Sequence, residues 1–262
     1  MTIMRLVDAH CHLESDFFIH DLDGIIAGAR KAGIVRLITA SITPDQWSVS
    51  TAIARRFTEV ECALGVHPWY VRAEHLRRLH ELTTAREQGA VAIGEIGLDS
   101  KTNSDNFALQ VEAFERQLAI ACAIDLPVVI HCRGAFQELH GLLKTIGVPP
   151  AGALIHSFNG SAELAGQFMK LGVSFSLGGI LTYRDSKKRE KLMKTIYPRH
   201  FLLETDSPDI PPIEARNDPG APNVPENILY NLRAAAEILG ESEEDVAENT
   251  TKNAVRIFGL KL

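Results

Sequence analysis

Short apolar runs alternate with longer amphipathic segments along the whole chain, so strands and helices are expected in regular succession. Eight of the short runs are apolar over most of their length, which is typical of strands that are buried on both faces. They span Leu6–Ala9, Val35–Thr39, Glu61–Val66, Ala90–Glu95, Pro127–Cys132, Ala153–His156, Val173–Leu177 and Phe201–Thr205.

Amphipathic segments fill the intervals between these runs and predict helices. The clearest one covers residues 105–125, where apolar side chains from Phe107 to Leu118 recur at spacings of three or four. Similar patterns predict helices at 22–32, 44–57, 74–88, 135–146, 161–171, 186–196 and 224–239, and one or two terminal helices at 242–258.

Eight strands, each followed by a helix, predict an α/β protein with a (β/α)8 TIM barrel as a single domain covering residues 1–262. A doubly wound open sheet is the alternative, but it usually carries a glycine-rich turn after an early strand, and the sequence has none. The longest irregular segment, 207–223, follows the eighth strand and is expected to form a wall of the binding site.

The composition is that of an ordinary globular protein, with 45% hydrophobic and 23% charged residues, so a disordered chain is excluded. The formal net charge of −6 disfavours a protein that grips duplex DNA by broad charge neutralisation. The four cysteines show no CxxC spacing, and the sequence contains no apolar run of about 18 residues. The first residues are not expected to act as a signal peptide, because Asp8 interrupts the apolar stretch. We therefore expect a cytoplasmic protein with reduced thiols and no membrane association.

Residues that commonly bind metals stand at the carboxyl ends of several predicted strands, where TIM-barrel enzymes hold their active sites. His10 and His12 lie two apart, so both face the same side of an extended chain. A buried carboxylate is costly unless it is paired or binds a cation, which favours a metal site. The expected ligands are His10, His12, Glu95, His131, His156 and Asp206.

Six ligands are more than one catalytic ion requires, because an open tetrahedral site uses three protein ligands. They suit two divalent ions that share a carboxylate and lie about 3.5–4 Å apart. Glu95 lies on the strand between the two groups of histidines and is therefore the expected bridge. Imidazoles suit Zn²⁺, while mixed sites of histidine and carboxylate also accept Mn²⁺, Ni²⁺ or Mg²⁺.

Several motifs of the chain resemble those of the TatD family of metal-dependent hydrolases, within the amidohydrolase-like group. The resembling segments are Asp-Ala-His-Cys-His-Leu at 8–13, Gly-Val-His-Pro at 65–68, Gly-Glu-Ile-Gly-Leu-Asp at 94–99, Leu-Pro-Val-Val-Ile-His-Cys-Arg at 126–133, His-Ser-Phe-Asn-Gly at 156–160, Leu-Glu-Thr-Asp-Ser-Pro at 203–208 and the ending from Asn249 to Phe258. The resemblance covers nearly the whole chain in the right order and implies the same barrel.

The resemblance also implies how the ligands are divided and what the protein does. One ion would be held by His10, His12, Glu95 and Asp206, and the other by Glu95, His131 and His156. The implied activity is that of a deoxyribonuclease that trims single-stranded DNA, or another phosphodiester, with a metal-activated hydroxide. The expected catalytic residues are Asp206, which accepts the proton of the attacking water, and the bridging Glu95. No obligate protein partner is expected.

Three residues next to the ligands have two interpretations each. His67 contacts a substrate phosphate or caps its strand before a proline. Arg133 clamps a phosphate with two hydrogen bonds or forms a structural ion pair. Glu204 accepts a hydrogen bond from a ligand imidazole and orients it, or pairs with a nearby arginine.

Two other functions stay open at this point. The same nucleophile serves an amidohydrolase-like enzyme acting on a small phosphoester, amide or lactone, because fold and metals do not select the substrate. A non-catalytic metal-binding scaffold is the third interpretation.

The substrate is expected to be selected by a pocket formed from 67–73, 99–106 and 207–223, with Arg216 meeting phosphates. Ser100 and Gly134 depart from the aromatic residue and the acid that the family often has at these positions. Both departures are expected to affect contacts with the substrate.

Overall fold

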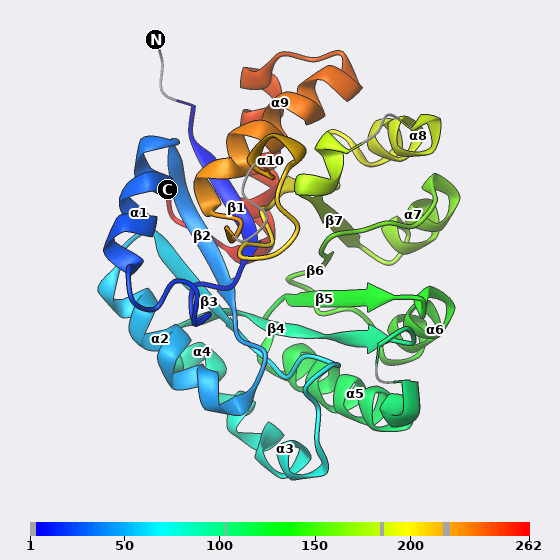
Figure 1. Cartoon of the computed structure of the whole chain (residues 1–262). Helices are drawn as coiled ribbons and strands as arrows, with labels where there is room; N and C mark the ends of the chain where they lie inside the picture. The colour runs from blue at the N-terminus through cyan, green and yellow to red at the C-terminus, as the bar shows by residue number, and fades with distance from the viewer. Residues whose placement is uncertain (1–3, 103, 184–185, 217–220) are drawn as a thin grey trace.

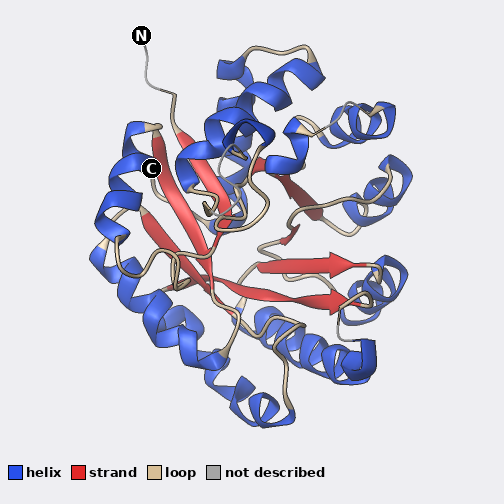
Figure 2. Cartoon of the chain, viewed as in Figure 1, coloured by secondary structure: helices blue, strands red, loops and turns tan. Residues whose placement is uncertain are grey.

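The chain folds as a barrel of parallel strands surrounded by helices (Figures 1 and 2). The computed structural model describes residues 4–102, 104–183, 186–216 and 221–262. Neighbouring strands pair in chain order from the first to the eighth, and every pair in this series is parallel. The predicted (β/α)8 barrel is thereby confirmed.

All eight predicted strands overlap observed ones, although several ends differ. The strands are β1 (Leu6–Cys11), β2 (Ile34–Ala40), β3 (Val60–Leu64), β4 (Ala90–Asp99), β5 (Val128–Arg133), β6 (Ala153–Ile155), β7 (Val173–Leu177) and β8 (Phe201–Leu203). β4 extends four residues beyond the predicted end, whereas β6 and β8 end early. Shortly after β6 and β8, Ser157 and Asp206 adopt φ angles of 45° and 56°, which an extended strand does not allow.

Helices follow the strands on the outside of the barrel, as the amphipathic segments predict. They are α1 (Leu22–Lys31), α2 (Trp47–Arg56), α3 (Ala73–Arg78), α4 (Ala85–Gln88), α5 (Phe107–Ile124), α6 (Phe136–Ile146), α7 (Ala162–Met169), α8 (Lys187–Ile196), α9 (Ile228–Leu239) and α10 (Glu243–Phe258). Within the described ranges, no helix is both long and apolar enough to cross a membrane.

The single helix predicted over 74–88 is wrong. A 3-10 helix, Leu79–Thr84, separates α3 from α4. Leu79 and Leu82 are both buried, and the 3-10 geometry brings residues three apart onto one side. Two adjacent β-branched residues, Thr83 and Thr84, also weaken a continuous α-helix here.

The hydrophobic core has two layers. One lies between the strands and the surrounding helices, and the other fills the inside of the barrel with small side chains such as Ala63 and Ala92. Phe258 at the end of α10 packs into this inner layer. Asn253 of α10 donates a 2.8 Å hydrogen bond to the carbonyl of Phe201, the first residue of β8. The last helix therefore plugs the barrel at the amino ends of its strands.

Backbone hydrogen bonds just beyond the strands join the last strand to the first at the opposite end. The amide of Asp206 donates to the carbonyl of His10 at 3.0 Å. The amide of His12 donates to the carbonyl of Ser207 at 2.8 Å. These two bonds fix the residues after β8 against the end of β1, where the chemically active side chains lie.

Candidate metal centre

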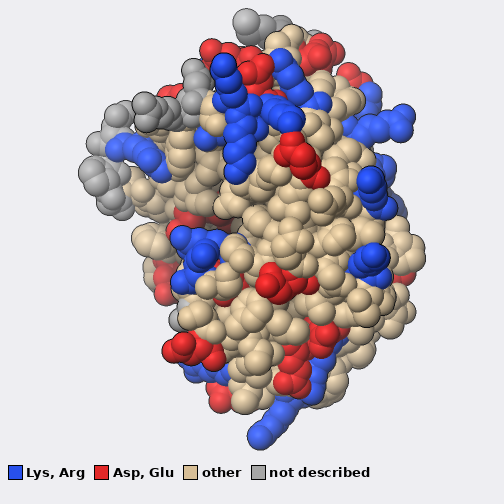
Figure 3. All heavy atoms as spheres, turned by 90° about the vertical axis from the view of Figure 1, so that its right-hand side faces the viewer, with Lys and Arg blue, Asp and Glu red and all other residues tan. Residues whose placement is uncertain are grey.

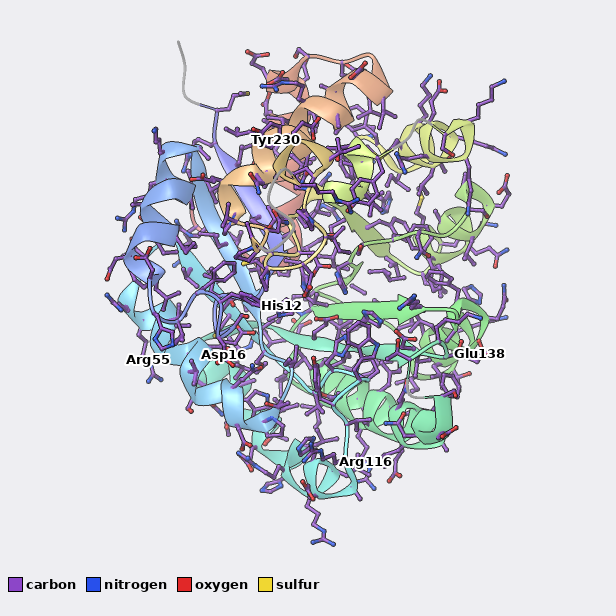
Figure 4. All side chains as sticks on the ribbon, viewed as in Figure 1. His12, Asp16, Arg55, Arg116, Glu138 and Tyr230 are labelled. Atoms are coloured by element: carbon purple, nitrogen blue, oxygen red, sulfur yellow. The ribbon has the colours of Figure 1, made fainter. Side chains whose placement is uncertain are left out.

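The structure brings all six predicted ligands together at the carboxyl ends of the strands. They border a cavity of about 660 Å³ or lie directly beneath it. Figure 4 labels His12 near the middle of the picture, with Asp16 of the same loop to its lower left. The six side chains are His10, His12, Glu95, His131, His156 and Asp206.

Glu95 stands between two sets of imidazoles. Its Oε2 atom lies 3.3 Å from Nε2 of His10 and 3.5 Å from Nε2 of His12. Its Oε1 atom lies 2.9 Å from Nε2 of His156 and 3.4 Å from Nδ1 of His131. Each carboxylate oxygen therefore faces a different pair of histidines, which is the arrangement required of a carboxylate shared by two ions.

Asp206 approaches the set of histidines that faces Oε2 of Glu95. Its Oδ1 atom lies 3.5 Å from Nε2 of His10 and 3.7 Å from Nε2 of His12. The same atom is 4.0 Å from Nδ1 of His156. Asp206 thus meets the end of β1 and also reaches a histidine from the other set.

His67 lies closer to the centre than the sequence indicates. Its Nε2 atom is 3.0 Å from Oε1 of Glu95, and His67, Glu95 and His131 form a group whose ligand atoms lie within 4.8 Å of one another. Burial lowers the pKa of His67 to about 4, so its ring is neutral. The sequence signal was present, because His67 follows an apolar run as His131 and His156 do.

Two buried imidazoles lack the hydrogen bonds that burial normally demands. Among the described residues, neither ring nitrogen of His10 or His156 has a hydrogen-bond partner, although both rings lie close to Glu95. Buried polar atoms without partners cost free energy, and natural proteins contain few of them. Cations between the nitrogens and the carboxylates would satisfy these atoms, so the side chains fit a metal centre.

The charge states of Glu95 and His10 also fit metal binding. Burial alone would raise the pKa of Glu95, but nearby imidazoles, above all His67 and His156, hold it well below its usual range. Burial lowers the pKa of His10 well below its usual 6.5. An ionised carboxylate and a neutral imidazole are the forms that bind metal ions.

Asp99 holds His131 in place, a role that was not predicted from the sequence. Its Oδ2 atom lies 3.0 Å from Nε2 of His131 and accepts a 2.6 Å hydrogen bond from the indole of Trp69. Its Oδ1 atom accepts bonds from the amides of Lys101 and Thr102, each at 2.8 Å. With Nε2 engaged in this way, Nδ1 of His131 faces Glu95.

The extension of β4 carries Asp99 to this position. Residues 95, 97 and 99 share one side of the strand, because side chains alternate between its two sides. This alternation would have identified Asp99, but the predicted strand ended at Glu95. Gly97 lies between them with a φ of 151°, and a Cβ atom there would collide with the backbone carbonyl of His131. Glycine is required for this close approach of β4 and β5.

Glu14 is a second supporting residue that was not predicted from the sequence. Its Oε1 atom lies 3.4 Å from Nδ1 of His12, which also lies 2.7 Å from the carbonyl of Ala40. The hydroxyl of Thr39 donates a 2.5 Å hydrogen bond to the other carboxylate oxygen of Glu14. Nε2 of His12 is thereby left to face Glu95.

Glu204 is buried beside His156, with its Oε2 atom 3.9 Å from Nδ1. It accepts a 2.8 Å hydrogen bond from the amide of Ser157 and another from the hydroxyl of Ser176. The ion pairs of the described residues include none between Glu204 and an arginine. Glu204 therefore acts on His156 mainly through the backbone of the next residue, and burial raises its pKa to about 8.

The cavity above the centre differs in part from the predicted pocket. Segments 67–73 and 207–223 contribute lining residues, but the described part of 99–106 does not. Residues 103 and 217–220 lie outside the described residues. Arg216 does not line the cavity either, because its guanidinium lies over the ring of Tyr183, 4.1 Å from the centroid. Arg133 does line it and is exposed.

Ser100 and Gly134, the two departures noted in the sequence, lie against each other. The hydroxyl of Ser100 donates a 2.8 Å hydrogen bond to the carbonyl of Gly134. Gly134 has a φ of 73°, and a Cβ atom there would lie 2.6 Å from the oxygen of Ser100. Neither residue lines the cavity, so the expectation that they contact substrate directly is not supported by the described geometry.

Comparison with known proteins finds one family across the chain. Residues 7–259 match the family model described as TatD related DNase. The chain is 31% identical to the uncharacterized metal-dependent hydrolase YabD of Bacillus subtilis, covering 97% of this chain and 99% of that protein. It is 30% identical to the uncharacterized metal-dependent hydrolase YjjV of Escherichia coli, covering 98% and 99%.

Solved structures resemble the whole barrel. The crystal structure of the TatD homologue YjjV from Escherichia coli superposes with a TM-score of 0.91 at 29% identity, covering 99% of this chain and 100% of that one. A TatD family hydrolase from Entamoeba histolytica gives a TM-score of 0.83 at 19% identity, covering 98% and 99%. This second likeness extends the shared fold to a more distant sequence.

Proposed function

This chain belongs to the family of TatD-related DNases and is a metal-dependent hydrolase, and on that premise we propose that it trims single-stranded DNA from an end by hydrolysing phosphodiester bonds. The proposed cofactors are two divalent ions, with Zn²⁺, Mn²⁺, Ni²⁺ and Mg²⁺ as candidates. The proposed ligands are those predicted from the sequence, together with His67 as a further nitrogen near the second ion.

One observation carries the proposal, namely that the two oxygens of Glu95 face different pairs of histidines beneath an open cavity. Divalent ions held there would supply a Lewis acid for a phosphoryl oxygen and would lower the pKa of water toward neutrality. Glu95 keeps the two sets of ligands at a fixed separation. Asp99, Glu14 and Glu204 restrain the imidazoles that lie around it.

Asp206 is the proposed general base. Burial, with a further contribution from Glu204, raises its pKa to about 7, although His156 and His12 act in the opposite direction. A carboxylate of this kind accepts the proton of the attacking water at neutral pH and returns it to the leaving oxygen. The position of Asp206 at the cavity, 3.5 Å from His10, supports this role.

Arg133 is the proposed phosphate contact. It is exposed at the cavity, and the ion pairs of the described residues include none for it, so its guanidinium can bind a phosphate by two hydrogen bonds. The cavity is also lined by Asp16 and Asp209, which repel a long polyanion. Figure 3 shows the flank covered by α5 to α8, where basic side chains are interspersed with acidic ones. Few nucleotides are therefore bound at a time.

The test is an assay of metal-reconstituted protein on single-stranded DNA labelled at the 3′ or the 5′ end. Progressive shortening that requires added metal supports the proposal, and the labelled end identifies the polarity. The same protein is offered a panel of lactones and small phosphoesters. Rapid turnover of those compounds, with the oligonucleotides left intact, would show that the enzyme acts on small substrates. If no compound is turned over, the protein would instead be a non-catalytic metal-binding scaffold.

The matched variant is Asp206→Asn. Asparagine keeps the size and one oxygen but cannot accept a proton near neutral pH, so turnover falls by at least about 100-fold. Metal content is measured on the same sample, because Asp206 is also a proposed ligand. A fully loaded variant that retains its rate would remove Asp206 from the proton transfer.

A further inference from the structure

Two aromatic rings stand exposed at the mouth of the cavity. Phe17 is 67% exposed and Tyr70 is 42% exposed, and both line the cavity above Glu95. Exposing aromatic rings to water in this way is unfavourable. Aromatic side chains gathered at the entrance of a site, rather than scattered, indicate a surface for a ligand.

Hydrogen-bonded turns position both rings. Phe17 is followed by Phe18, which is 1% exposed and anchors the loop in the core. The amides of Phe18 and Ile19 donate to the carbonyl of Ser15 at 2.9 and 3.1 Å. The turn therefore directs one phenylalanine inward and leaves its neighbour at the cavity.

Tyr70 is connected to the candidate metal centre through His67. Its amide donates a 3.0 Å hydrogen bond to the carbonyl of His67, and the two rings lie 5.7 Å apart between centroids. Nε2 of His67 lies 3.0 Å from Glu95. A flat group bound on Tyr70 consequently lies next to a phosphate bound at the centre.

We propose that Phe17 and Tyr70 form an aromatic rim that stacks the unpaired bases of a nucleic-acid end whose phosphate lies at the metal centre. This inference rests on the proposed function and names the part of the substrate that the cavity recognises. Every base has a flat face, so stacking on aromatic rings tolerates any sequence. Bases within a duplex already stack on their neighbours and are not free to do so.

The local charges favour recognition through bases over recognition through the backbone. Asp16 adjoins Phe17 in the sequence, and both Asp16 and Asp209 line the cavity. These carboxylates oppose a row of phosphates, while Arg133 offers a cation for one of them. A ligand that contributes one phosphate at the centre and flat uncharged groups around it fits this distribution.

The experiment compares two oligonucleotides on the same proteins. One is a short oligothymidylate, and the other has abasic spacers in place of the two nucleotides at each end. Phe17→Ala and Tyr70→Ala are each expected to raise KM for the first on the order of 10-fold, with kcat within about twofold. Neither variant should change KM for the abasic oligonucleotide, because that substrate has no terminal bases to stack.

Three controls separate stacking from other effects. Phe17→Tyr and Tyr70→Phe keep a ring and should retain the wild-type KM. Ile213→Ala removes a side chain that is 52% exposed but does not line the cavity, and it should change nothing. Two results would contradict the proposed rim. One is a lower KM for the oligothymidylate than for the abasic oligonucleotide that persists in both alanine variants, and the other is an equal rise of KM in Ile213→Ala.

Binding is also measured without turnover, by fluorescence anisotropy of the two labelled oligonucleotides on metal-loaded Asp206→Asn protein. The oligothymidylate should bind about 10-fold more tightly than the abasic one, and Phe17→Ala and Tyr70→Ala in this background should each reduce that ratio. If the wild-type protein binds the oligothymidylate more tightly but cleaves neither oligonucleotide, the result would support the aromatic rim and contradict the proposed nuclease activity. If both oligonucleotides bind equally well and are cleaved, the result would contradict the aromatic rim but not the nuclease activity.

Discussion

The carboxylate of Asp8 binds Thr205 twice, although the two residues lie 197 positions apart in the sequence. Oδ1 accepts the amide of Thr205 at 2.9 Å, and Oδ2 accepts its hydroxyl at 2.6 Å. The amide of His10 also donates to Oδ1, at 3.3 Å. Asp8 thus connects β1 to the residues that follow β8, and it sets His10 opposite Asp206 across the end of the barrel.

We expect Asp8→Ala to reduce both the stability of the fold and the affinity for metal. The variant leaves the buried amide and hydroxyl of Thr205 without their acceptor, which costs about 2–4 kcal/mol of unfolding free energy. Urea unfolding of the metal-free proteins measures this loss, and isothermal titration measures metal binding. Asp8→Asn keeps one oxygen acceptor and should lose less.

The matched control is Asp23→Ala, which removes an exposed aspartate of α1 that pairs only with Arg56 among the described ion pairs. A surface pair of this kind contributes about 0–1 kcal/mol. Equal unfolding free energies for the Asp8 and Asp23 variants would contradict the connecting role of Asp8.

Asp99→Asn should weaken one metal ion selectively. In the wild type, one oxygen of Asp99 contacts His131 and Trp69, and the other accepts a hydrogen bond from the amide of Lys101. Asparagine has only one such oxygen, and its NH₂ group would face donors on the other side. His131 therefore loses its orientation. Losing such a support typically lowers metal affinity 10–100-fold. Elemental analysis and titration should find about one tightly bound ion per chain, against the two that we propose for the wild type.

Glu138→Gln supplies the control, because it neutralises a carboxylate on α6 that does not line the cavity. It should bind metal as the wild type does. Simultaneous loss of both ions in Asp99→Asn would show that the two sites are not divided between the oxygens of Glu95 as proposed.

The fold and the six proposed ligands were predictable because each strand has a simple signature. Five of the eight apolar runs end in a histidine or a carboxylate or are followed by one, and a parallel barrel brings all such ends to one face. His131 on β5 and Asp206 after β8 are therefore placed near each other without any knowledge of the loops. The alternation of residues on β1 likewise places His10 and His12 on one side.

The supporting residues were harder to predict, for reasons that differ from residue to residue. Glu14 lies in a loop after β1, and hydrophobic periodicity does not encode the path of a loop. Asp99 lies in a part of β4 that continues past Glu95, and glycines at 94 and 97 obscured the strand pattern. Phe17 and Phe18 are adjacent and chemically identical, so only the turn at Ser15 distinguishes the exposed ring from the buried one.

Phe258→Ala should destabilise the protein without changing the metal centre. The ring is 4% exposed and fills the inner layer of the barrel at the end far from the cavity. Removing a buried phenylalanine costs about 3–5 kcal/mol, while the more conservative Phe258→Leu should cost less than about 1.5 kcal/mol. Urea unfolding of the two variants measures both values.

Phe17→Ala is the matched control for Phe258→Ala, since it removes the same side chain from an exposed position. Its unfolding free energy should stay within about 0.5 kcal/mol of the wild type. A Phe258→Ala protein as stable as Phe17→Ala would mean that α10 does not plug the barrel.

Metal affinity should increase steeply with pH, because bound protons must leave the ligands. Burial would lower the pKa of His12, but Glu14, Glu95 and Asp206 raise it to about 10. Burial likewise opposes a charge on His131, and Asp99 with Glu95 raises its pKa to about 9. Both imidazoles therefore carry a proton at pH 7.5 in the metal-free protein, and a metal ion binds only to the deprotonated nitrogen.

The sign follows from these two values, since each proton released on binding makes the affinity increase about tenfold per pH unit until the pH exceeds the pKa. Between pH 6.5 and 8.5, the combined affinity for the two proposed ions should increase by about 100-fold per unit, because both pKa values lie above this range. Isothermal titration in two buffers with different heats of ionisation counts the protons directly, and we expect about two per chain at pH 7.5, one from His12 and one from His131. Heats that do not depend on the buffer would show that these imidazoles are already neutral, and that Glu14 and Asp99 orient them without holding a proton on them.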